Sequence, residues 1–262
     1  ARYYWKRQRD CGHFTGVRLV SVNNNVLVVD AGNTAIKWAL FKADCLVWQG
    51  REEALELNLP ESVETIYFAS VRSEEDNQAI LRRLACLLPE VPVLTLTTTA
   101  NACSVSNGYL EPHRLGIDRW LAVLAVYHQY RQAVVLVDAG TAIKVDFVDA
   151  SGQHLGGYIV PGRNLMERSL VLNTGRIRYT EADMLSPSSL PNNTGLAVRM
   201  GCDEMVLGFL QRILQRFPNR QYVFTGGDGE LLMEQLKIEA VYDGNLVLQG
   251  AKLLGDEWMS NG

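Results

Sequence analysis

One segment of this chain occurs twice, and the repeat constrains the fold more than any other feature of the sequence. The two copies, whose first aspartates lie 108 positions apart, are Asp30-Ala31-Gly32-Asn33-Thr34-Ala35-Ile36-Lys37 and Asp138-Ala139-Gly140-Thr141-Ala142-Ile143-Lys144. An apolar run precedes each copy, at 26–29 and 134–137, and a strand-like segment follows each, at 37–41 and 144–148. This order predicts a buried strand, a tight turn and a return strand, built twice.

The residues of the two turns are suited to holding phosphate. Gly32 and Gly140 have no Cβ, so an anion can approach the backbone N–H groups, and the hydroxyls of Thr34 and Thr141 add donors. The aspartate that ends each strand can face a cation or its water shell. A single Asp-x-Gly is more often an ordinary hairpin turn. Because an ordinary turn has no reason to repeat its Asp, Thr and Lys together, we interpret the pair as a phosphate clamp.

The length and composition suit two related domains. The 262 residues are 47% hydrophobic, which is enough to bury a substantial core. We expect an α/β fold of two domains, 26–116 and 117–262, with the boundary within or near an apolar helix at 117–130 and a nucleotide in the cleft between them. The other expected strands are 46–52, 64–70, 91–96, 142–149, 154–160 and 222–224, and the other expected helices begin at a Ser73 cap and near 165, 195, 229 and 245.

Residues 1–25 differ from the rest of the chain in charge. They hold five basic residues and one acidic residue, whereas the whole chain has a net charge of −4. We expect this segment to be a leader or extension outside the fold, with a basic binding arm as the alternative. The net charge argues against a nucleic-acid partner. No apolar stretch approaches the ~20 residues of a membrane span, so we expect a cytoplasmic protein with no membrane partner.

The segment Gly116-Ile117-Asp118-Arg119 lies where an irregular loop enters the apolar helix. Charged side chains at the start of such a helix need a reason to be there. One reason is capping with a local ion pair, where an Asp near the N-terminus contributes about 0.3 to 1 kcal/mol. The other is chemistry: Asp118 accepts a proton as a general base, and Arg119 binds a substrate carboxylate through two parallel hydrogen bonds.

Two further motifs have two interpretations each, and a third has one. The glycines of 225–229 could let a base or ribose lie on the backbone, or form a plain strand-to-helix turn. Those of 156–162 indicate either a closely packed hairpin or a wall of the site. Asn193-Thr194 is most simply a helix N-cap. The four histidines and five cysteines show no metal-ligand spacing, so we expect packing or surface roles for the histidines and neither a disulfide framework nor a zinc site.

In this order, the motifs resemble those of type III pantothenate kinases over about residues 26–250. The motifs that carry the resemblance are Asp30-x-Gly32-Asn33-Thr34-x-x-Lys37, Tyr109-x-x-Pro112-x-x-Leu115-Gly116-x-Asp118-Arg119, Asp138-x-Gly140-Thr141-Ala142-x-x-x-Asp146, Gly156-Gly157-x-Ile159-x-Pro161-Gly162, Asn193-Thr194 and Thr225-Gly226-Gly227. Lys144 stands where other members carry Thr, and residues 1–25 have no counterpart in the family pattern.

The resemblance implies the duplicated actin-like fold of sugar kinases and heat-shock-protein ATPases, and a homodimer whose interface helps to build the substrate site. It implies phosphoryl transfer from ATP to pantothenate, the first step towards coenzyme A, with Mg²⁺ and a monovalent cation, K⁺ or NH₄⁺. It also implies the residue roles. The expected ATP and phosphate contacts are Asp30, Ala31, Gly32, Asn33, Thr34, Ala35, Ile36, Lys37 and Thr141. The expected pantothenate contacts are Tyr109, Gly116, Ile117, Asp118, Arg119 and Thr194, with Asp118 as proton acceptor and Asp138 as ligand of the monovalent cation.

Two other functions remain open on the same fold. A switch ATPase would hydrolyse nucleotide to change shape, and a shared fold does not fix the function. A non-catalytic regulatory relative, such as a transcription accessory factor, is the more serious alternative. The presence of Asp118, Arg119 and both loops favours the enzyme.

Overall fold

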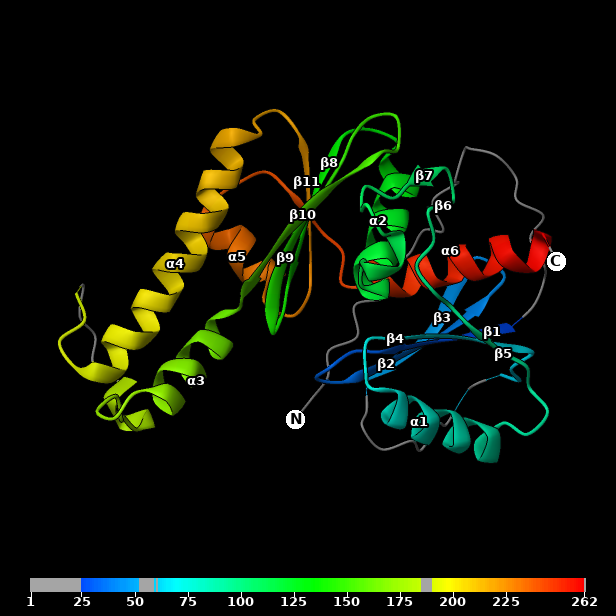
Figure 1. Ribbon diagram of the computed structural model, residues 1–262, viewed down its shortest axis with the longest axis horizontal. Coiled ribbons are helices and arrows are strands. Elements are labelled where there is room, and N and C mark those ends of the chain that lie inside the picture. Colours follow the sequence, from blue (N-terminus) through cyan, green and yellow to red (C-terminus); the bar gives the residue numbers. More distant parts are fainter. Residues whose placement is uncertain (1–24, 52–58, 60, 185–189, 262) are drawn as a thin grey trace.

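Two five-stranded sheets with the same strand order form the framework of the molecule (Figure 1). The computed structural model describes residues 25–51, 59, 61–184 and 190–261, so the proposed leader, apart from Asn25, lies outside the described residues. The first sheet has the order β3-β2-β1-β4-β5, and the second has the order β10-β9-β8-β11-β12. In both sheets the three strands that follow one another in the chain are antiparallel and the other two join in parallel. The predicted duplication is therefore confirmed.

The elements lie close to their predicted positions. The strands of the first sheet are β1 (Asn25–Ala31), β2 (Ile36–Lys42), β3 (Cys45–Arg51), β4 (Thr65–Ser70) and β5 (Val93–Thr95), and those of the second are β8 (Val134–Ala139), β9 (Ala142–Val148), β10 (His154–Pro161), β11 (Gln221–Thr225) and β12 (Val241–Tyr242). The helices are α1 (Glu74–Leu87), α2 (Ile117–Tyr130), α3 (Arg163–Asn173), α4 (Thr194–Arg216), α5 (Gly229–Leu236) and α6 (Leu246–Asn261). Short elements that the sequence pattern did not predict are β6 (Asn101–Ala102), β7 (Val105–Ser106), β12 and the 3₁₀ turns Pro112–Arg114 and Glu181–Met184.

Helices α2 and α6 pack against each other between the two sheets (Figure 1). Both helices are apolar on several faces, so burial on more than one side removes most of their apolar surface from water. Their shared core includes Val28 of the first sheet, Leu136 of the second, and Trp120 and Leu121 of α2. Helix α2 ends at Arg131, whose left-handed backbone (φ 49°) stops the helix. One core thus joins the two sheets through these helices.

The outer faces of the sheets have separate cores. Helix α1, capped by the Ser73 hydroxyl as predicted, covers the first sheet through Ile80 and Leu84. Helices α4 and α5 cover the second sheet. Figure 1 shows α3 and the beginning of α4 extending away from both sheets. Within the part of the chain that the structure describes, no helix is both long and apolar enough to cross a membrane.

Candidate active site

The two copies of the repeated loop meet face to face. The hydroxyl oxygens of Thr34 and Thr141 lie 2.8 Å apart and share a hydrogen bond, although 107 positions separate them in the chain. Each threonine stands in the turn that follows the first strand of its sheet. The two turns therefore meet at these hydroxyls, and the phosphate clamp stays a prediction.

The strand register repeats as well. Asp30 of β1 pairs with Lys37 of β2, and Asp138 of β8 pairs with Lys144 of β9. Directly opposed residues of an antiparallel pair place their side chains on the same face of the sheet. The extra residue of the first copy is absorbed in the turn, so both copies present an aspartate beside a lysine.

The beginning of α2 brings Asp118 to the second loop. The Lys144 ammonium donates hydrogen bonds to Asp118 Oδ2 at 2.9 Å and to Asp138 Oδ2 at 2.8 Å. Burial would lower the pKa of Lys144, but the charges of Asp138 and Asp118 outweigh it and raise this pKa. Asp118 Oδ1 accepts a hydrogen bond from the Arg119 backbone N–H, as an Asp in the first turn of a helix does. Asp118 thus binds a backbone N–H of its own helix and the Lys144 ammonium of β9.

Asp30 is the most buried carboxylate of this group. Its residue is 8% exposed, and burial raises its pKa from 3.8 to about 6, with Lys37 opposing this rise and Asp118 and Asp138 adding to it. Three carboxylates from different elements therefore act on one another electrostatically at the end of β1 and β8. Oxygen ligands of this kind suit Mg²⁺, which proteins usually hold through one or two carboxylates together with substrate phosphates. The residues present fit Mg²⁺, with Asp30 as a candidate ligand.

Arg119 is engaged within the protein. Its Nε and Nη2 donate to the two oxygens of Asp146 at 2.9 and 2.6 Å, and its Nη1 donates to the hydroxyl of Tyr109 at 2.7 Å. His154, which is fully buried, places Nε2 2.9 Å from Asp146 Oδ1, and its ring stacks on that of Tyr109. The bidentate side of the guanidinium, which was expected to bind a substrate carboxylate, therefore faces Asp146 in this structure.

Sequence reasoning expected a packing or surface role for His154, which is fully buried, and named Asp146 only within a motif. A signal for both was present on β9, where Lys144 and Asp146 occupy alternate positions of an otherwise apolar strand. Alternate residues of a strand point to the same face. That face meets α2, so the consecutive residues Asp118 and Arg119 pair with Lys144 and Asp146 respectively.

The glycine motifs pack closely against the residues of the site. Gly226 has φ +84°, and a Cβ there would lie 2.3 Å from the Ala139 carbonyl oxygen and 2.7 Å from Asp138 Oδ1. A Cβ at Gly157 would lie 2.6 Å from Asp146 Oδ1, and one at Gly162 would lie 2.4 Å from the Gly140 carbonyl oxygen. These glycines allow neighbouring segments to pack directly against the second loop and the Asp146 pair, which favours the interpretation of close packing.

The structure does not bring every expected residue to this place. Ile36 and Ile117 bury their side chains in two apolar cores, so only their backbone groups could contact a ligand. Thr194 is the exposed first residue of α4, and Asn193 caps that helix as predicted. Figure 1 shows this end of α4 far from α2. Within one chain, Thr194 is therefore remote from Asp118.

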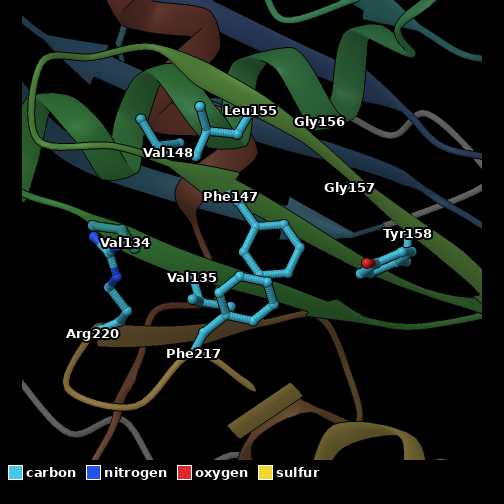
Figure 2. A pocket seen from close by; sticks show the side chains of 10 residues that line it. All are labelled: Val134, Val135, Phe147, Val148, Leu155, Gly156, Gly157, Tyr158, Phe217 and Arg220. Atoms are coloured by element: carbon cyan, nitrogen blue, oxygen red, sulfur yellow. The ribbon is translucent and has the colours of Figure 1, made fainter. Parts of the chain in front are cut away.

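A cavity of about 320 Å³ lies elsewhere, at the opposite ends of β8 and β9 (Figure 2). Val134 begins β8 and Val148 ends β9, whereas Asp138 and Ala142 lie at the loop end of these strands. Figure 2 shows Phe147 and Phe217 side by side in its lining, with Arg220 at one edge. None of the carboxylates of Asp30, Asp118 and Asp138 lines this mostly apolar cavity, so we place the candidate site at the two repeated loops.

Comparisons with known proteins match this chain to one family. A family model described as type III pantothenate kinase matches residues 26–216. A type III pantothenate kinase of Marinomonas sp. (strain MWYL1) is 47% identical over 91% of this chain and 98% of its own length. One from Pseudomonas aeruginosa (strain LESB58) is 36% identical over 80% of this chain and 91% of its own length.

Solved structures share the fold at low identity. A Campylobacter jejuni protein described as a Baf family transcriptional activator superposes with a TM-score of 0.55 and 22% identity, over 89% of this chain and 98% of the other. The activator of 2-hydroxyisocaproyl-CoA dehydratase from Clostridium difficile, solved with bound ADPNP, gives a TM-score of 0.50 and 12% identity, over 90% and 96%. The duplicated architecture is the actin-like fold of sugar kinases and related ATPases.

Proposed function

We propose that this chain, which belongs to the type III pantothenate kinase family, transfers the γ-phosphoryl group of ATP to the primary hydroxyl of pantothenate, forming 4′-phosphopantothenate for coenzyme A synthesis. The observation that carries the proposal is the meeting of both loops, through Thr34 and Thr141, beside the carboxylates of Asp118 and Asp138. A phosphate clamp next to a candidate proton acceptor is the arrangement that phosphoryl transfer to an alcohol needs.

The loops align the phosphates and neutralise their charge. Backbone N–H groups of Gly32, Asn33 and Thr34 form one side of the clamp, with the Lys37 ammonium, and Thr141 forms the other. Asp30 would hold Mg²⁺ that enters with ATP, and the ion would supply positive charge to the phosphoryl oxygens. Phosphoryl transfer asks the protein mainly for such alignment and charge stabilisation.

Asp118 accepts the proton of the attacking hydroxyl. Its carboxylate is held on two sides, by the Arg119 backbone N–H and by Lys144, so its orientation is fixed before substrate binds. A general base contributes most when it is within hydrogen-bond reach of the proton that it removes. Gly116 lies two residues before Asp118, and a Cβ at Gly116 would lie 2.8 Å from Asp118 Oδ1. The glycine therefore leaves the carboxylate room in the turn.

Tyr109 and Arg119 shape the pantothenate site. Because Asp146 occupies the bidentate side of Arg119, we assign Arg119 to holding the Tyr109 hydroxyl, and through it to orienting the substrate. Direct contact with the pantothenate carboxylate would require Nη1, the guanidinium nitrogen that now faces Tyr109. Removal of Arg119 would also leave the Asp146 carboxylate buried without its main partner, which is strongly destabilising.

A homodimer would complete this site. Thr194, expected to contact pantothenate, is remote from Asp118 within one chain, so a second copy would have to supply it. Helices α3 and α4 and the segment between them also expose large apolar side chains, as a surface between copies would: Leu165, Leu170, Leu172, Leu190 and Met205.

The monovalent cation expected at Asp138 stays a prediction. Potassium and ammonium ions would bind there through the carboxylate, but in this structure Asp138 Oδ2 already accepts a hydrogen bond from Lys144. The family pattern therefore implies a monovalent cation at Asp138, whereas in this chain the Lys144 ammonium contacts the same carboxylate.

One assay tests the proposed function: consumption of ATP measured with and without pantothenate. We expect consumption to depend on pantothenate, and Asp118→Asn to lower turnover by roughly 10² to 10⁴ while ATP binding, measured by calorimetry, changes little. Consumption that ignores pantothenate would indicate a switch ATPase, and none at all, in potassium or ammonium salts, would indicate a regulatory relative. Near-normal turnover of the variant would remove Asp118 from its role.

A further inference from the structure

Lys144 occupies the position between two carboxylates where a bound monocation would be expected. Its ammonium lies 2.9 Å from Asp118 Oδ2 and 2.8 Å from Asp138 Oδ2, which are distances of charge-assisted hydrogen bonds. The strand register fixes this placement, because Lys144 and Asp138 are directly opposed across β8 and β9. All three side chains are about one-fifth exposed, so solvent screens the interaction only in part.

The remaining carboxylate oxygens leave little room for another cation. Asp118 Oδ1 accepts the Arg119 backbone N–H, and Asp138 Oδ1 lies beside Gly226, close enough that a Cβ at Gly226 would approach it to 2.7 Å. A second monocation between the two carboxylates would lie next to the lysine ammonium and would be repelled by it. The residues present therefore do not fit K⁺ or NH₄⁺ at Asp138.

We propose that the Lys144 ammonium takes the place of the monovalent cation, holding Asp118 and Asp138 in position so that the enzyme works without added K⁺ or NH₄⁺. The inference rests on the proposed kinase function for its activity readout. The physical basis is that a lysine head is an ammonium ion tethered to the chain. The lysine charge is always present at the site. It loses no translational entropy of association there, whereas a free ion must be bound from solution.

A different role for Lys144 is contact with the ATP phosphates. In that case the side chain would leave Asp118 and Asp138 when nucleotide binds, and the two carboxylates would again need a cation. The two roles make opposite predictions for the salt dependence of the enzyme, so one set of measurements separates them.

The test compares the wild-type protein with Lys144→Thr in choline, potassium and ammonium chloride at equal ionic strength. Wild-type turnover, at saturating ATP and pantothenate, should be the same in all three salts. Turnover of the variant should fall roughly 10- to 100-fold in choline, and potassium or ammonium should restore most of it, because the ion replaces the lost charge. Lys42→Thr, which removes an exposed lysine paired with Glu61, is the matched control and should behave as wild type.

Thermal unfolding gives a readout that needs no activity. A cation that binds the folded protein raises the midpoint of unfolding in a saturable way. Potassium should do so for Lys144→Thr and not for the wild type, even if pantothenate proves not to be the substrate. Saturable activation or stabilisation of the wild type by potassium would overturn the proposal. A variant that shows only a raised KM for ATP, in every salt, would overturn it in favour of phosphate contact.

Discussion

At the scale of single residues, Asp30 is a buried carboxylate whose ionisation opposes folding. Burial raises its pKa from 3.8 to about 6, although Lys37 lies opposite it and lowers that pKa. A carboxyl group with a raised pKa keeps its proton in the folded protein at pH values where the unfolded chain has lost it. The raised pKa makes Asp30 a candidate site residue, because perturbed pKa values cluster at functional sites.

Asp30→Asn should remove this penalty. In the wild type the free energy of unfolding should fall as the pH rises from about 4 to about 6, and above pH 6 the loss should total about 3 kcal/mol. The variant should lack that slope, so the difference between the two proteins should grow from pH 4 to 6 and then stay constant. Urea unfolding without nucleotide or Mg²⁺ measures it. Asp44→Asn, at an exposed aspartate, is the control, and parallel curves for Asp30→Asn and wild type would contradict the prediction.

At the scale of elements, α6 approaches its neighbours through glycines. A Cβ at Gly250 would lie 1.9 Å from the Leu121 carbonyl oxygen of α2, and one at Gly255 would lie 2.3 Å from the Tyr67 ring of β4. The Tyr67 hydroxyl also donates to Asp256 of the same helix. Close backbone approach of this kind leaves no space for a methyl group.

Gly250→Ala should therefore destabilise the protein although alanine favours helices. We expect the free energy of unfolding to fall by about 3 kcal/mol, because the added methyl group must push α6 away from α2. Gly208→Ala, at an exposed position of α4 where a Cβ would meet nothing, should instead raise the free energy of unfolding by up to about 1 kcal/mol. Denaturant unfolding of both variants gives the comparison. If Gly250→Ala were as stable as Gly208→Ala, α6 would not pack as described.

Local patterns in the sequence were enough to predict most elements. The apolar runs before Asp30 and Asp138 are buried strands, and the helix expected at 117–130 is α2 with the same bounds. Periodicity and capping signals act within a few residues, so a single sequence reveals them. The repeated Asp-Ala-Gly segment also predicted that the two sheets would share one topology.

Contacts between distant residues were not predictable in this way. Asp146 and Arg119 are 27 positions apart, and their pairing depends on how α2 crosses the second sheet. The link between Lys144 and Asp118 depends on the same crossing. The residues favoured a substrate carboxylate at Arg119, and the resemblance implied a cation at Asp138. Neither line of reasoning could reveal the internal partners of these two side chains. The domain boundary near 117–130 stays a proposal, with α2 packed between both sheets.

At the scale of the whole molecule, the proposed dimer can be tested with a substitution on its expected surface. Leu172, near the end of α3, is 79% exposed, and Leu172→Glu places a charge on the surface proposed to pair with a second copy. We expect the variant to sediment as a monomer, since burying an unpaired carboxylate between copies is unfavourable. Its pantothenate-dependent turnover should be lost while ATP binding persists, because Thr194 would no longer reach the other copy.

Met259→Glu is the matched control for the dimer. Met259 is a large apolar residue near the end of α6 that is 49% exposed, and its substitution should leave both the sedimentation and the turnover unchanged. A Leu172→Glu protein that stays dimeric, or a monomer with full turnover, would show that another surface joins the copies or that one copy is sufficient.

The position of α6 also bears on how the chain folds as it is synthesised. The last helix packs against β1, β2 and β4, and so covers one face of the first sheet. A domain that emerges first from the ribosome usually folds first, at synthesis rates of about 5–20 residues per second. Here the first sheet would keep that face exposed until Leu246–Asn261 have been translated. Nascent chains of this protein would therefore remain exposed to chaperones and proteases for nearly the whole time of their synthesis.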